Sequence, residues 1–147
     1  MTLVLPALPE NVALARVALA AFAAQIDFTL GEIEEIKVAV SEAVSNAVLH
    51  AYPGGPGEVR VEGRLYPDRL EVVVEDSGQG MEDVGRARRA GFSSQPERLG
   101  LGFTFMESFM DGLEVESAVG RGTTVRMVKR PGSPAARQEG GAAQGRR

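Results

Sequence analysis

The stretch "VSEAVSNAVLH", residues 40–50, predicts a helix with two different sides. Its valines and most of its alanines fall in one arc of a helical wheel, as in a helix that packs on a sheet. Glu42 and Asn46 lie four residues apart on another flank, and the only histidine, His50, follows four residues later. Taken alone, such a row is more often a solvated helix face than a ligand site. Whether it binds a ligand therefore depends on the rest of the chain.

The limits of this helix can be predicted from its flanks. Thr29 and Glu32 have the spacing of a capping box, so the helix is expected to begin there. The glycines and prolines of "YPGGPG", residues 52–57, cannot continue a helix and are expected to form a loop. The helix is therefore expected to run to about Leu49.

Before this helix, residues 3–7 predict a short strand at a sheet edge, because Pro6 has no N–H to donate. Residues 9–25 form an alanine-rich amphipathic segment, which predicts a first helix with Pro9 in its first turn. Its expected core contacts are Val12, Leu14, Val17, Leu19 and Phe22.

The rest of the chain predicts two hairpins and one more helix. β-branched or alternating residues indicate strands at 58–66, 69–76, 113–118 and 122–129. The glycine-rich, charged segment from Ser77 onward is expected to be a long loop or lid, followed by a helix at 102–110. This order predicts an α+β fold, a two-layer sandwich with helices on one face of a mostly antiparallel sheet. We expect one domain at 1–130 and a disordered tail at 131–147.

Composition excludes several classes of function. The chain of 147 residues has no cysteine, which excludes disulfides and thiolate metal sites. The net charge is −4, and the last 17 residues carry +2, so residues 1–130 carry −6. An acidic body argues against direct binding to nucleic acid and suits a partner with basic patches. The sequence has no apolar run long enough to span a membrane, and its start lacks the basic residues of a signal peptide. We therefore expect a cytoplasmic protein.

Three glycine-containing motifs follow the row on the helix. "EDSGQGM", residues 75–81, ends a strand with a carboxylate that can accept a hydrogen bond from a planar ligand. "ERLGLGF", residues 97–103, has two glycines before the expected helix, whose N-terminus is a potential anion site. "GRGTTV", residues 120–125, is a turn and strand start. Each motif alone is also explained by an ordinary turn, and neither the dinucleotide fingerprint nor a P-loop is present.

Together and in this order, the motifs resemble the ATP-binding domain shared by DNA gyrase, MutL and sensor histidine kinases, known as the Bergerat fold. The stretches "SEAVSNAVLHAY", "GFSSQPERLGLGFTFMESFMD" and "GTTVRMVK" are similar to the bacterial anti-sigma factor serine kinases, most of all the sporulation anti-sigma F group. The resemblance covers about residues 3–130. It implies an ATP-dependent protein serine kinase that sequesters a sigma factor and phosphorylates its anti-anti-sigma antagonist. It also implies ATP or ADP, Mg²⁺ and a homodimer.

The resemblance also implies roles for individual residues. Glu42 would be the general base, and Asn46 would bind the nucleotide and ligate Mg²⁺. Asp76 would accept a hydrogen bond from the adenine amino group. The other implied positions are Gly78 and Gly80 beside the nucleotide, Gly100, Leu101 and Gly102 at the phosphates, Arg98 at the γ-phosphate, Thr123 or Thr124 at adenine, and Arg16 at the sigma-binding surface.

Two positions depart from the family pattern. Leu99 stands where relatives often have serine, and Gln95 stands where a lysine is expected. Three alternatives stay open, and these departures motivate the second of them. The chain is a stress-response kinase of the anti-sigma B type, a nucleotide-binding inhibitor without useful kinase activity, or a detached histidine-kinase catalytic domain. The last would need a phosphoacceptor histidine outside the nucleotide motif, and His50 lies inside it.

Overall fold

The computed structural model describes residues 1–88 and 97–132, without the side chains of Ala87 and of residues 97–101. Its elements follow the order strand, two helices, two strands, two helices and two strands. They are β1 (Thr2–Pro6), α1 (Glu10–Ala23), α2 (Leu30–Asn46), η1 (Ala47–Ala51), β2 (Glu58–Tyr66), β3 (Arg69–Asp76), α3 (Val84–Arg88), α4 (Glu97–Phe109), β4 (Gly112–Ala118) and β5 (Gly122–Lys129).

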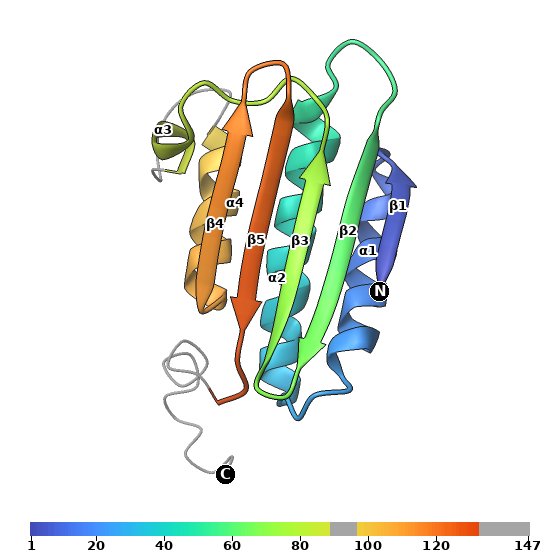
Figure 1. The fold of residues 1–147 in the computed structure, drawn as a ribbon, viewed down its shortest axis with the longest axis vertical. Coiled ribbons are helices and arrows are strands. Elements are labelled where there is room, and N and C mark those ends of the chain that lie inside the picture. The colour runs from blue at the N-terminus through green and yellow to red at the C-terminus, as the bar shows by residue number, and fades with distance from the viewer. Residues whose placement is uncertain (89–96, 133–147) are drawn as a thin grey trace.

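The described strands form one antiparallel sheet in the order β1-β2-β3-β5-β4. Helices α1, α2 and α4 all lie on the same face of this sheet (Figure 1). The predicted α+β two-layer sandwich is therefore confirmed, and so is the edge position of β1. The core lies between the layers, where alternate residues of β2, β3 and β5 meet the helices.

Helix α2 is the centre of the helical layer. Thr29 and Glu32 form the predicted capping box, in which each side chain accepts a hydrogen bond from the other residue's backbone N–H. Ile36, Val40 and Val44 are fully buried against the sheet side. The apolar arc predicted from "VSEAVSNAVLH" is thus the packing face of this helix.

Helix α1 packs differently from the prediction. Val12 and Phe22 pack against the core and Leu19 is fully buried, but the side chains of Leu14 and Val17 are about half exposed, at 48% and 60%. Their prediction as core residues was wrong. The inner face instead contains Ala15 and Ala23, which are fully buried. Apolar residues occur on both sides of α1, so the sequence pattern alone does not distinguish the buried side.

Helix α4 begins at Glu97, five residues before the predicted start at Gly102. Gly100 and Gly102 therefore lie inside the helix and not before it, and the short helix α3 lies within the predicted lid. Phe103 and Met106 are buried on the side of α4 that meets α2 and the sheet. This tertiary packing overrides the low helix propensity of glycine.

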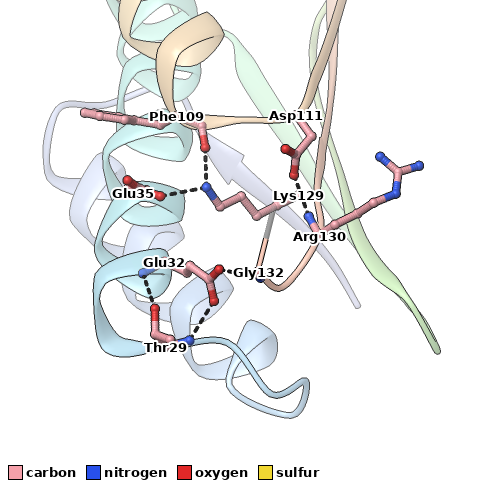
Figure 2. A network of polar contacts seen from close by, with 8 residues as sticks. All are labelled: Thr29, Glu32, Glu35, Phe109, Asp111, Lys129, Arg130 and Gly132. Carbon is pink, nitrogen blue, oxygen red and sulfur yellow. Dashed lines mark hydrogen bonds and ion pairs between the residues drawn. The ribbon is translucent and has the colours of Figure 1, made fainter. Parts of the chain in front are cut away.

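At the end of the sheet opposite the β3–α3 connection, a buried ion pair joins three elements (Figure 2). Lys129 Nζ, at the end of β5, contacts Glu35 Oε1 of α2 at 2.7 Å and also donates to the carbonyl oxygen of Phe109 in α4. Lys129 is fully buried and Glu35 is 6% exposed. Nearby, Glu32 accepts a hydrogen bond from the backbone N–H of Gly132 at 2.6 Å. The predicted helical wheel did not reveal these pairs.

Candidate functional site

The polar row on α2 lies where α4 crosses it. Glu42 and Asn46 are both half-buried. A β-carbon added at Gly102 would lie 3.1 Å from Glu42 Oε1 and 3.4 Å from Asn46 Nδ2. The absence of a β-carbon at Gly102 therefore leaves room for α4 to lie close to the two predicted functional side chains.

Asn46 has an unsatisfied polar atom. Its Nδ2 atom is buried and has no hydrogen-bond partner among the described residues. Buried side-chain amides normally have partners, because an unpaired one costs about 1–3 kcal/mol. An unsatisfied NH₂ donor fits an acceptor that is bound next to α2, such as a phosphate oxygen. A metal ion would instead use the amide oxygen of the same side chain.

The row ends in a π-helical turn. Residues Ala47–Ala51 form η1, directly after α2, where the sequence predicted a continuous helix to about Leu49. Turns of this type carry one extra residue per turn and occur frequently at functional sites. The turn places His50 in the lining of a cavity.

This cavity, of about 170 Å³, lies between η1, the end of β3 and the start of β5. Its wall is mainly apolar, with Phe103 on α4 and Val74 and Val125 on the sheet. The polar residues of the wall are Asn46, His50, Asp76, Gln79 and Thr123. An apolar cavity with a few polar groups is the usual form of a small-molecule site.

Asp76 is the one carboxylate that lines the cavity among the described residues. Its Oδ1 accepts hydrogen bonds from the backbone N–H groups of Gly78, at 2.9 Å, and Thr123, at 3.3 Å. Burial raises the pKa of Asp76 above its ordinary value, and the two backbone N–H groups only partly oppose this shift. A ligand donor that bonds the carboxylate would therefore stabilise a charge that the protein alone does not fully compensate.

The glycines that follow Asp76 pack against the protein's own backbone. A β-carbon at Gly78 would lie 2.2 Å from the carbonyl oxygen of Ala51, and one at Gly80 would lie 2.1 Å from that of Ala118. Gly80 also has a φ of +73°, which favours glycine. The motif thus needs glycine for close packing, and its predicted proximity to a nucleotide stays a prediction.

The three residues predicted at the phosphates are Gly100, Leu101 and Gly102, and all three lie in α4. Gly100 and Leu101 lie in α4, and the side chains there are not described; the same holds for Arg98 and Leu99. Gln95 lies outside the described residues. Because the helix begins at Glu97, the N–H groups without helical partners belong to its first turn and come before Gly100 and Gly102.

The remaining predicted positions, Thr123, Thr124 and Arg16, do not all lie at the cavity. Thr123 lines the cavity, and its Oγ1 is 2.7 Å from Ser117 Oγ. Thr124 is the next residue along β5, so its side chain lies on the opposite face of the sheet. Arg16 lies on α1, away from the residues that line the cavity, and its Nη1 donates to Ser41 Oγ at 3.1 Å.

The sequence reasoning missed Tyr52 and Gln79. The Tyr52 hydroxyl donates to the carbonyl oxygen of Glu58 and accepts from the N–H of Ser77. Gln79 Nε2 donates to the carbonyl oxygen of His50 at 2.6 Å. Their only sequence signal is position, since Tyr52 directly follows the row and Gln79 lies between the two glycines.

Comparison with known proteins agrees with this geometry. Residues 5–129 match the histidine kinase-like ATPase domain family. The chain is 47% identical to an anti-sigma F factor of Caldanaerobacter subterraneus subsp. tengcongensis, over 82% of this chain and 85% of that protein. It is 45% identical to an anti-sigma F factor of Oceanobacillus iheyensis, over 88% and 90% of the two chains. The chain belongs to the anti-sigma F factor family of histidine kinase-like ATPases.

Solved structures with the same fold are sensor kinases. The chain matches the mycobacterial sensor histidine kinase MprB with a TM-score of 0.57 at 22% identity, covering 89% of this chain and 99% of that one. It matches the histidine kinase domain of the Erythrobacter litoralis EL346 blue-light activated histidine kinase with a TM-score of 0.53 at 25% identity, covering 74% and 47%. Membership of this ATPase family implies that the chain binds ATP or ADP.

Residues 1–88 and 97–132 contain no group of three or more histidine, aspartate or glutamate side chains that could hold a metal ion. A metal at Asn46 would therefore depend on oxygen atoms from elsewhere, which Mg²⁺ commonly takes from substrate phosphates and water.

No helix in the described part of the chain is long and apolar enough to cross a membrane.

Proposed function

We propose that this protein is an ATP-dependent protein serine kinase that also binds and holds a sigma factor. The observation that carries the proposal is the cavity beside α2, which combines Asp76 at one wall with an unsatisfied Asn46 at another. A base with an exocyclic amino group satisfies the first, and a phosphate oxygen that accepts from Asn46 Nδ2 satisfies the second. Membership of an ATPase family supports adenine as the base.

In the proposed reaction, Asp76 accepts a hydrogen bond from the adenine amino group, with Thr123 beside it. Glu42 takes the proton of the attacking serine hydroxyl while the serine oxygen bonds to the γ-phosphorus. The bond from that phosphorus to the bridging oxygen breaks, and ADP leaves. Mg²⁺, held by Asn46 and by phosphate oxygens, would neutralise the charge that develops there. Gly102 lets α4 lie close to Glu42 and Asn46.

The proposed partners follow from the curated relatives, which are named anti-sigma F factors. The protein would bind a sporulation-type sigma factor in the cytoplasm, with Arg16 at the contact, and would phosphorylate a serine of an anti-anti-sigma antagonist. A homodimer is also proposed. The exposed apolar residues at the β1 edge and on the outer side of α1 support it, namely Val4, Leu8, Leu14 and Val17.

The kinase proposal can be tested with Glu42→Gln. The purified protein is mixed with Mg²⁺-ATP and its cognate antagonist, and serine phosphate is measured by mass spectrometry. The variant is expected to bind ATP normally but to transfer phosphate roughly 10²- to 10⁴-fold more slowly, which is the usual contribution of a general base. Undiminished transfer would contradict the assigned role of Glu42.

Glu34→Gln is the matched control, because Glu34 is an exposed glutamate of the same helix paired with Lys37. It is expected to transfer phosphate at the wild-type rate. If the wild type binds ATP but phosphorylates no antagonist, the protein is a nucleotide-binding inhibitor. Phosphorylation of a stress-pathway antagonist in place of a sporulation one would move it to the anti-sigma B type.

A further inference from the structure

Three consecutive residues at the end of η1 contact the loop that follows Asp76. The carbonyl oxygen of His50 accepts from Gln79 Nε2 at 2.6 Å, and that of Ala51 accepts from the backbone N–H of Gln79 at 2.8 Å. The Tyr52 hydroxyl accepts from the backbone N–H of Ser77 at 2.9 Å. We call these three contacts the η1 clasp. It joins η1, which directly follows Asn46, to the loop that follows Asp76.

Within the clasp, Tyr52 has a defined position. Its hydroxyl is fixed from the other side, because it donates to the carbonyl oxygen of Glu58 at 2.6 Å. Its ring lies against Gly57, where an added β-carbon would be only 2.4 Å from three ring carbons. The phenol oxygen is therefore held between the first residue of β2 and the residue after β3.

The contact with Ser77 acts next to the carboxylate. The backbone N–H groups of Ser77, Gly78 and Gln79 bond in turn to Tyr52, to Asp76 itself and to Ala51. These three bonds restrain the loop that follows Asp76, and the bond from Gly78 acts directly on the Asp76 side chain. Loss of the first bond would remove the restraint that the Tyr52 hydroxyl places on the peptide directly after Asp76.

We propose that Tyr52 is a positioning residue for base recognition, acting through Ser77 on the Asp76 carboxylate. The inference rests on the proposed function, because it assumes that Asp76 recognises adenine. It extends that function by assigning base selectivity to a residue that does not line the cavity. The role predicts a loss of discrimination between bases rather than a general loss of nucleotide affinity.

The test is Tyr52→Phe in the full chain, which removes the hydroxyl and keeps the ring against Gly57. Titration calorimetry measures the affinity for ATP and for purine riboside triphosphate, which lacks the exocyclic amino group. We expect ATP affinity to fall roughly three- to tenfold, as for the loss of one hydrogen bond. The affinity for the purine analogue should stay within about twofold, so the selectivity ratio falls.

Tyr66→Phe is the matched control, because Tyr66 is the other tyrosine and lies at the far end of β2. It should leave both affinities unchanged. Gly57→Ala is a second variant, which keeps the hydroxyl but displaces the ring, and it should reproduce the loss of selectivity even if Tyr52→Phe folds poorly.

Equal weakening of both nucleotides, or unchanged ATP binding in Tyr52→Phe and Gly57→Ala, would overturn the positioning role. A different outcome would contradict the proposed function itself. If the wild type does not prefer ATP to the purine analogue, then Asp76 does not recognise the amino group, whatever Tyr52 does.

Discussion

At the scale of single residues, Asp76 is where folding and ligand recognition have opposite requirements. Burial disfavours its charged form, while the N–H groups of Gly78 and Thr123 favour it. An adenine amino group would add a hydrogen bond to the charged form only. The residue therefore costs stability in the free protein and contributes affinity in the complex.

The first prediction replaces Asp76 with Asn. The new side chain can still accept from Gly78, but its NH₂ group would face the adenine amino group, so two donors would meet. We expect ADP affinity to fall about tenfold or more, while the urea midpoint at pH 7 stays the same or rises. Calorimetric titration and urea unfolding measure the two quantities. Asp68→Asn is the control, since Asp68 is exposed and is paired with Arg69.

The second prediction concerns pH. Because the pKa of Asp76 is raised above 3.8 in the folded protein, the folded state binds more protons than the unfolded chain between the two values. The contribution of this group to stability therefore decreases as pH rises through that window. The difference in the free energy of unfolding, Asp76→Asn minus wild type, should therefore increase as pH rises through this window. ADP affinity should show the reverse trend and weaken as pH falls through the raised pKa.

Urea unfolding of both proteins at a series of acidic pH values tests this difference directly. A stability difference that is constant over the window would show that Asp76 has the same proton affinity in both states. Comparison with Asp76→Asn removes the titration of the other carboxylates, which is common to both proteins.

The third prediction is Gly102→Ala. Alanine is favoured over glycine in a helix by about 1 kcal/mol, so the stability of α4 should not decrease through propensity. Its β-carbon would lie 3.1 Å from Glu42 Oε1, so Glu42 or α4 has to move. We expect phosphotransfer to fall at least tenfold with little change in melting temperature. Gly54→Ala, in open space in the loop after η1, is the control.

Sequence reasoning found the residues of the candidate site that belong to motifs, such as Asn46 and Asp76, and the cavity brings them together. It missed Tyr52, whose contact with Ser77 joins residues 25 positions apart without any periodic pattern. It also explained Gly78 by a ligand, whereas the carbonyl of Ala51 already requires glycine there. Contacts between segments, rather than patterns within them, decide these roles.

At the scale of elements, four of the strands were predicted closely, because alternating apolar and polar residues indicate directly which face of a strand is buried. The bounds of β2, β3 and β5 agree with the prediction, and β4 differs by one residue. The start of α4 was predicted wrongly, because two glycines usually indicate a break. Burial of Phe103 and Met106 extends the helix through them, and single-sequence propensity does not contain that information.

The fourth prediction concerns the ion pair that joins α2, α4 and β5. Lys129→Met would leave Glu35 buried without its partner, and the cost is expected to be about 3–5 kcal/mol. Glu35→Leu should cost a similar amount. The double variant should lose far less than the sum, because no uncompensated charge remains inside the protein.

Urea unfolding of the two single variants and the double variant gives the coupling energy. Lys37→Met with Glu34→Leu is a matched cycle on the same helix, since that pair is exposed and should show a coupling below about 1 kcal/mol. Additive effects at Lys129 and Glu35 would contradict the role of the buried pair.

At the scale of the whole molecule, the described contacts of the C-terminal segment reach Gly132. Its backbone N–H bonds Glu32, and Arg130 N–H bonds Asp111 Oδ2. Helix α2 and the connection from α4 to β4 are thus both tied to the residues that follow β5 (Figure 2).

The fifth prediction is that a chain ending at Gly132 keeps the melting temperature of the full chain to within about 3 °C, the effect of roughly 1 kcal/mol in a domain of this size. A chain ending at Val128 lacks Lys129 and should lose several kcal/mol. Differential scanning calorimetry of the three lengths measures this. A large loss on ending at Gly132 would mean that residues 133–147 contribute to the stability of the domain.

The position of β5 has a consequence for synthesis in the cell. Among the described strands β5 is the last to leave the ribosome, yet it lies inside the sheet, between β3 and β4. Until it emerges, a nascent chain that already contains β1 to β4 exposes the pairing edge of β3, and β4 has no strand to join. The sheet therefore cannot be completed until β5 has emerged, and the nascent chain is most open to aggregation or chaperone capture before that point.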